Sequence, residues 1–191
     1  MEELPHQHVE HAEHAEHAAH SGDGFAIKVS ATIAGLAVVA AIIASLESME
    51  TASLLGAKNE AVLKQSQASN QWAYYQAKSV KQNLYELAIP TAGEKAADYA
   101  ARAKRYDEEI VEIQKKANEL EEARDHALHQ GEGHEHRHHG LTIAATLVHV
   151  GIAVTTLAII TKGKRWPWYA GMALAAAGVA KAALTYLPMG H

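Results

Sequence analysis

The sequence contains no cysteine, which excludes a disulfide framework and any thiolate metal site. It also has no phosphate-binding glycine loop, no G-x-S-x-G nucleophile elbow and no paired dinucleotide-binding glycines. Its acidic residues fall on charged helical faces, where contact with solvent accounts for them. We therefore expect no enzymatic activity, no catalytic residue and no nucleic-acid partner.

What the sequence does have is three long apolar runs, at residues 25–46, 141–161 and 166–187. Each reaches the ~20 residues that a helix needs to cross ~30 Å of hydrocarbon. We therefore expect an all-α integral membrane protein with three transmembrane helices and the lipid bilayer as its surroundings. The remaining segments are an acidic N-terminal tail, a polar stretch, a short loop and a C-terminal tail, at 1–24, 47–140, 162–165 and 188–191.

Charged residues near the apolar runs are unevenly distributed. The tail 1–24 carries six acidic residues and no Lys or Arg, whereas the loop 162–165 carries three basic residues and no acidic one. Because short basic loops stay in the cytoplasm, we place this loop and the N-terminus on the cytoplasmic side. The first run follows an acidic segment, so we expect a retained anchor rather than a cleaved signal peptide. The stretch 47–140 then lies on the periplasmic side.

The polar stretch predicts an antiparallel helical hairpin with its turn near 88–93, where Pro90 and Gly93 interrupt the helical pattern. The second arm has strict 4-3 spacing, which indicates a coiled-coil seam. Its seam positions are Tyr99, Ala103, Tyr106, Ile110, Ile113, Ala117, Leu120, Arg124 and Ala127.

The seam of the first arm holds mostly small and amide residues, which must find hydrogen-bond partners if they are buried. Because a lone two-helix hairpin also leaves apolar surface uncovered, we expect the protein to form a homo-oligomer. An unknown protein partner is also possible. The seam positions of the first arm are Leu54, Ala61, Gln65, Ala68, Trp72, Tyr75, Ser79 and Gln82.

One local run of residues resembles a known protein family. The letters Asn70-Gln-Trp-Ala-Tyr-Tyr-Gln-Ala-Lys78, with the basic turn Lys162–Trp168 after the second apolar run, resemble the bacterial membrane family of domain of unknown function 4337. The resemblance implies a bacterial inner-membrane protein, and it carries no established activity. We hypothesise that one helical face around this motif binds the other arm, another subunit, or a ligand or peptide. Its residues are Gln71, Trp72, Tyr75, Gln76, Lys78 and Ser79.

Histidine is concentrated in two tracts. The first runs from His6 to His20 at mostly three-residue intervals, and the second lies in the segment 131–140, which its glycines make flexible enough to wrap a cation. Imidazoles this dense can bind Zn or Ni, although solvated His-rich segments are also common. The weak metal candidates are His134, His136, His138 and His139.

The apolar runs contain two ionisable residues, His149 and Lys181, which counting along the helices places within several ångströms in depth. They fit a polar path in a channel-like oligomer, or a snorkelling lysine and a histidine that bonds a neighbouring helix. We favour a non-enzymatic structural or interaction module, with a channel and a histidine-based metal buffer or sensor as alternatives. Close packing is expected at small residues, namely Ala31, Gly35, Gly171, Ala175, Gly178 and Ala182.

Overall fold

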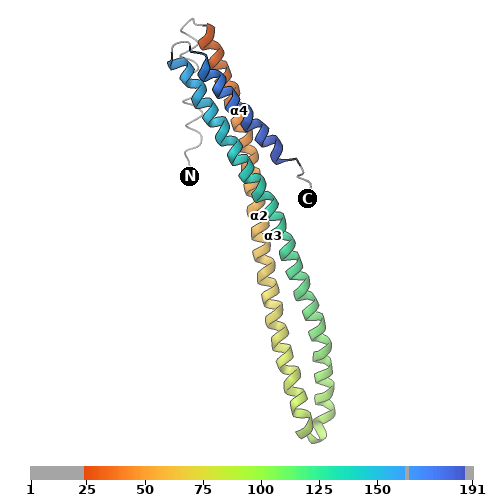
Figure 1. The fold of residues 1–191 in the computed structure, drawn as a ribbon. Helices are drawn as coiled ribbons and strands as arrows, with labels where there is room; N and C mark the ends of the chain where they lie inside the picture. Colours follow the sequence, from red (N-terminus) through yellow and green to blue (C-terminus); the bar gives the residue numbers. More distant parts are fainter. Residues whose placement is uncertain (1–23, 162–163, 188–191) are drawn as a thin grey trace. The chain divides into compact units, whose positions relative to one another are not determined.

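The computed structural model describes residues 24–161 and 164–187, and all the regular structure in this part of the chain is helical (Figure 1). Two α-helices of 65 residues each carry most of it: α2 at Gly24–Ala88 and α3 at Ala96–Ile160. Two short 3₁₀ turns, Ile89–Thr91 and Gly93–Lys95, join them, and α4 follows at Trp166–Thr185. The all-α prediction is confirmed.

Two helices in the described residues, α2 and α3, are long and apolar enough to cross a membrane. The third apolar run forms α4, which is not among them. Its composition explains the difference, because α4 begins with Trp166, Pro167 and Trp168 and contains Lys181, and these residues lower its mean hydropathy. Of the three predicted spans, two therefore correspond to helices that are long and apolar enough to cross a membrane.

The described chain separates into two compact units. The first unit holds the beginning of α2 up to Ala52, the end of α3 from Gly133, and α4. Its apolar core is made by α2 and α3, with Trp168 and Ala182 of α4 packed against it. The core residues are Val29, Ile33, Ala40, Ile43, Leu141, Ala144, Ala145, Val148, Ile152 and Ala158.

Helix α4 approaches α3 through glycines. A Cβ atom on Gly151 would lie 2.7 Å from the carbonyl oxygen of Gly171, and one on Gly178 would lie 2.8 Å from the carbonyl oxygen of Ala144. Such distances leave no room for a side chain, so the two backbones are in direct contact. Gly171, Ala175 and Gly178 are buried. The other predicted small-residue pair is different: Ala31 and Gly35 are exposed.

The second unit, Ser53–Glu132, is an antiparallel hairpin formed by the end of α2 and the beginning of α3 (Figure 1). Its reversal lies at residues 89–95, overlapping the turn expected at 88–93. Gly93 has a φ of +53°, a left-handed conformation that glycine adopts without the steric cost of a Cβ atom. Pro90 is the second residue of the first 3₁₀ turn, a position where its missing N–H costs nothing.

The arms of the hairpin meet along the seam that the 4-3 spacing of α3 predicts. Every one of its nine positions from Tyr99 to Ala127 is buried or half-buried. On α2 the seam positions are likewise buried or half-buried except Gln65, which is exposed and accepts a 2.7 Å hydrogen bond from Nη1 of Arg124. A polar pair therefore replaces apolar contact at the one predicted α3 position that is charged.

Candidate functional site

A buried carboxylate, Glu50, lies at the centre of the densest polar contact in the first unit. Glu50 is 9% exposed and follows the apolar run 25–46 by one helical turn. His134 Nδ1 lies 2.7 Å from Glu50 Oε2, and Arg137 Nε donates to Oε1 at 3.0 Å. The hydroxyl of Tyr186, just after α4, donates to Oε1 at 3.2 Å. Residues of α3 and a residue just after α4 thus meet at one side chain of α2. We call Glu50, His134, Arg137 and Tyr186 the Glu50 cluster.

The electrostatics of the Glu50 cluster favour the charged carboxylate. Burial raises the pKa of Glu50, but hydrogen bonds from His134 and Arg137 outweigh burial, so this pKa lies below its ordinary value. A carboxylate so close to the apolar run is costly unless it is paired. The cluster supplies that pairing.

The contacts of His134 are mutually exclusive. The Nδ1 atom that lies 2.7 Å from a Glu50 oxygen also lies 2.9 Å from Nη2 of Arg137. One ring nitrogen can donate a proton to the carboxylate or accept one from the guanidinium, but it cannot do both. The protonation state and tautomer of His134 therefore decide which of the two neighbours it holds.

A second, smaller group of polar contacts lies one turn along the same helices. Thr142 Oγ1 donates to Glu47 Oε1 at 2.5 Å, and His138 Nδ1 lies 3.8 Å from the same oxygen. His138 Nδ1 is also 3.2 Å from the hydroxyl of Thr51. Histidines four residues apart on α3 thus face carboxylates three residues apart on α2.

The second histidine tract is helical, so the expectation of a flexible loop around a cation is wrong. The helix turns His134 and His138 toward α2 and leaves His136 and His139 exposed. The expectation that the chain has no catalytic motif needs one correction: residues 134–138 match the letters H-E-x-x-H, a zinc-peptidase pattern.

No group of three His, Asp or Glu side chains surrounds a common metal position in the described segments. In the Glu50 cluster the guanidinium of Arg137 already occupies the place of a cation. The first tract, His6–His20, lies outside the described residues.

The second unit holds the face that the sequence proposes for interaction. Trp72 Nε1 donates to Glu121 Oε1 at 2.9 Å, and Lys78 Nζ lies 2.6 Å from Glu109 Oε2. The hydrogen bond to Glu109 raises the pKa of Lys78 and lowers that of Glu109. Much of this face therefore binds the other arm of the same hairpin. Gln71, Trp72, Tyr75, Lys78 and Ser79 are half-buried, and only Gln76 is exposed.

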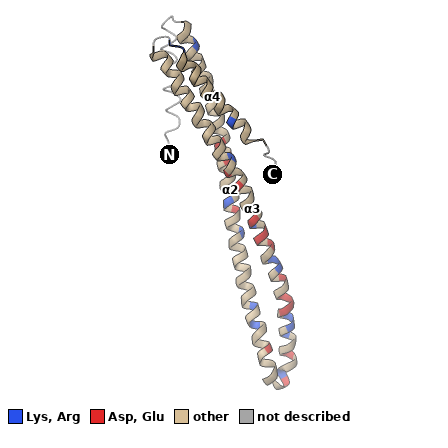
Figure 2. Ribbon diagram, in the orientation of Figure 1, with Lys and Arg blue, Asp and Glu red and all other residues tan. Residues whose placement is uncertain are grey.

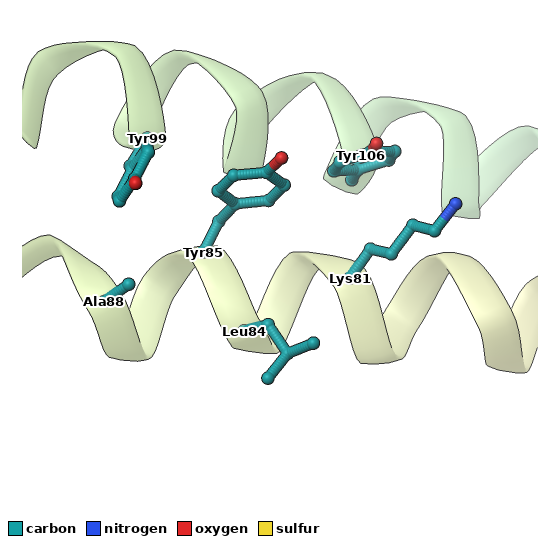
Figure 3. Close-up of a pocket in the computed structure, with 6 residues that line it drawn as sticks. All are labelled: Lys81, Leu84, Tyr85, Ala88, Tyr99 and Tyr106. Atoms are coloured by element: carbon teal, nitrogen blue, oxygen red, sulfur yellow. The ribbon is translucent and has the colours of Figure 1, made fainter. Parts of the chain in front are cut away.

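Near the reversal, aromatic rings fill the space between the arms. The ring of Tyr85 lies between Tyr99 and Tyr106, with centroid distances of 5.4 and 5.9 Å (Figure 3). Beside these rings lies a groove of about 380 Å³, and Figure 3 shows Leu84 directed away from α3 at its edge. The aromatic rings hold the arms together, while Leu84 faces outward.

Leu84 belongs to an apolar row on the side of α2 that α3 leaves uncovered. Val80, Leu84 and Leu87 are 57%, 61% and 77% exposed. Charged residues in the hairpin are denser on α3 than on α2 (Figure 2). We call this row the outer stripe; it consists of Leu55, Val62, Ala73, Ala77, Val80, Leu84 and Leu87, all exposed.

Residues 25–188 match the family model for domain of unknown function 4337 (DUF4337). The chain belongs to the DUF4337 family. This finding confirms the resemblance drawn from the Asn70–Lys78 motif. No curated protein and no solved structure shows a significant match to the chain.

The two ionisable residues in the apolar runs of this DUF4337 protein do not lie at one level. Gly151 approaches Gly171 and Gly178 approaches Ala144, which sets the register of α3 against α4. In that register His149 is level with α4 residues about eight positions before Lys181, an offset of ~12 Å. This offset is larger than the several ångströms expected from counting along the helices. His149 is exposed and Lys181 is half-buried.

Proposed function

We propose that this DUF4337 protein is a non-enzymatic, membrane-anchored module that self-associates through its helical hairpin. The observation that carries the proposal is the outer stripe, a row of exposed apolar side chains on α2 within the second unit. Exposed apolar side chains gathered on one helical face are costly in water and are typical of protein contacts. Association between hairpins removes that cost.

Membrane anchoring rests on the helices of the first unit. Both α2 and α3 are long and apolar enough to cross a bilayer, and large apolar side chains point away from the core they share. Val38, Ile42, Val150 and Leu157 are among these exposed residues, and lipid would cover them. We place α4 in the membrane as a third span, because its glycines pack against α3 along the apolar segment.

In this proposal the protein lies in a bacterial inner membrane, with its N-terminus in the cytoplasm and the hairpin in the periplasm. The basic residues near the start of α4, Lys164 and Arg165, support this orientation. The alternative channel loses support from the ~12 Å offset of His149 and Lys181. A metal buffer based on the second tract loses support from Arg137, which occupies the carboxylate that a cation would need.

The experiment is a measurement of mass in mild detergent, by native mass spectrometry and by light scattering over a range of protein concentrations. We expect the wild-type protein to be a defined oligomer. We expect a variant with Val80, Leu84 and Leu87 all changed to Ser to associate more weakly. It should be half-dissociated at a much higher protein concentration than the wild type. The matched control changes Val111 and Leu128, which are 65% and 44% exposed on α3, to Ser and should keep the wild-type mass.

Circular dichroism of each variant checks that the helices remain folded. A wild-type protein that is monomeric at every concentration contradicts the proposal. So does an oligomer whose mass is unchanged by the Val80, Leu84 and Leu87 substitutions but reduced by those at Val111 and Leu128.

A further inference from the structure

The second half of the outer stripe has a spacing that the hairpin itself does not use. Ala73, Ala77, Val80, Leu84 and Leu87 follow each other at intervals of four, three, four and three residues. This is the a/d pattern by which one helix packs against another in a coiled coil. The seam toward α3 is separate, since it uses Trp72, Tyr75, Ser79 and Gln82. Helix α2 therefore carries two helix-packing seams, of which the hairpin fills one.

The partner for the empty seam must be an uncharged helical face of similar width. The outward face of α3 does not qualify, because exposed Lys, Arg, Asp and Glu residues dominate it (Figure 2). The outer stripe of a second copy does qualify. Contact between the same patch on two copies is the arrangement of a two-fold dimer.

We infer that two copies of this chain pair through α2 alone, parallel and in register, with Ala73, Ala77, Val80, Leu84 and Leu87 of each copy facing their counterparts. This inference rests on the proposed function. Membrane anchoring gives both copies the same direction, so their α2 helices run parallel. In a parallel pair, each a or d residue lies opposite the identical residue of the partner.

The flanking positions are compatible with this pairing. With Ala77 and Leu84 at a positions, the e positions hold Tyr74, Lys81 and Ala88, and the g positions hold Gln76 and Asn83. In a parallel pair a g residue meets the e residue five positions later on the partner, so Gln76 meets Lys81. No two like charges face each other there, and the Gln76 amide oxygen can accept a hydrogen bond from the Lys81 ammonium.

Alanines at one end of the seam fit the same arrangement. Ala73 and Ala77 let the two backbones approach closely, whereas Val80, Leu84 and Leu87 fill the larger space toward the reversal. The three larger residues are 57%, 61% and 77% exposed in a single hairpin. They therefore have the most apolar surface to remove from water when a second copy binds.

The absence of cysteine makes a direct test possible in the full-length protein. Single-cysteine variants Val80→Cys, Leu84→Cys and Leu87→Cys are oxidised in detergent or membranes, and dimers are separated without reducing agent. We expect disulfide-linked dimers from at least the Val80 and Leu84 variants. Val111→Cys is the control, because Val111 is equally exposed but lies on α3, and it should yield at least tenfold less dimer.

A second variant tests the seam without an oxidant. Leu84→Glu places like charges opposite each other in the parallel pair and should raise the concentration for half-dissociation at least tenfold, whereas Val111→Glu should leave it unchanged. The inference is overturned if the wild-type protein is oligomeric but Val111→Cys cross-links as well as Leu84→Cys. It is also overturned if only mixed pairs of Ala73→Cys and Leu87→Cys cross-link, as in an antiparallel dimer. A monomeric wild-type protein instead refutes the proposed function itself.

Discussion

The Nδ1 atom of His134 lies 2.7 Å from Oε2 of Glu50, and this contact joins α3 to a buried carboxylate of α2. Neither residue is unusual when read alone. Glu50 follows an apolar run, and His134 belongs to a tract of histidines that could all be solvated. Together with Arg137 and Tyr186 they form a polar contact that ties three helical segments of the first unit.

The first prediction concerns the pH dependence of stability. Because the folded-state pKa of Glu50 is below its unfolded value, its stabilising contribution is complete above the unfolded pKa of about 4.5. That contribution is lost as the pH falls through the lower folded-state pKa. The Glu50→Gln variant should therefore melt at a lower temperature than wild type at pH 7, and the two should converge in acid. A difference in melting temperature that stays constant from pH 7 into acid would contradict the lowered pKa of Glu50.

The second prediction separates the two histidine pairs of the tract. His134→Ala removes a partner of the buried Glu50 and should lower the free energy of unfolding by roughly 1–3 kcal/mol. His136→Ala and His139→Ala change exposed residues of the same helix and should have effects within about 0.5 kcal/mol. Thermal or denaturant unfolding of the three variants in one detergent measures the difference. Equal effects at all three positions contradict the inward orientation of His134.

The third prediction concerns the glycines between α3 and α4. Gly171→Leu puts a side chain where backbone atoms already meet, so α4 should separate from α3 or the protein should fail to fold. Gly35→Leu is the control, since a Cβ atom on Gly35 has nothing within 4 Å. Yield of folded protein and melting temperature distinguish the two variants. If both behave alike, the backbone contact is not what holds α4.

The fourth prediction uses two glycines of the hairpin with opposite expected signs. Gly93→Ala forces a side chain into a left-handed conformation and should cost roughly 1–2 kcal/mol. Gly56→Ala lies in the interior of α2 with open space around it and should stabilise the helix by roughly 0.5–1 kcal/mol. Denaturant unfolding of both variants gives the two signs. A neutral Gly93→Ala would show that the reversal tolerates another conformation.

The fifth prediction distinguishes the hairpin interior from its outer surface. Trp72→Phe removes the hydrogen bond to Glu121 but keeps an aromatic ring between the arms. It should lower the free energy of unfolding by about 1–3 kcal/mol, because the lost hydrogen bond has a charged acceptor, Glu121. The oligomer mass should stay the same, since Trp72 faces α3. A change in oligomer mass without a change in the free energy of unfolding would indicate instead that Trp72 lies at the interface between subunits.

Patterns within one segment were sufficient to predict much of the fold. The 4-3 spacing from Tyr99 to Ala127 predicted the inward face of α3, because helical periodicity alone determines which residues share a face. Pro90 and Gly93 predicted the reversal for an equally local reason. The segment that forms α4 was expected to span a membrane. It is not among the helices apolar enough to do so, because the aromatic residues at its start and Lys181 lower its mean hydropathy.

The Glu50 cluster could not be predicted in the same way. The partners of Glu50 lie more than eighty residues from it in the sequence, and each residue alone has a simpler explanation. Glycines in the segment 131–140 favoured a loop, but the flanking helical residues continue α3 through them. Spacing placed the residues around Trp72 on one helical face, but only the position of α3 shows that Trp72 and Lys78 contact Glu121 and Glu109 of the other arm.

The contact between Gly151 and Gly171 limits how this protein can diverge. Because the spacing of α3 and α4 is set by backbone atoms, it does not depend on the size of the side chains that point outward from either helix. Relatives could exchange nearly every outward residue of α4 and still keep the same interhelical distance. Selection on this pair of helices would then act on a few glycine and alanine positions, and the rest of their surface would be free to change with its surroundings.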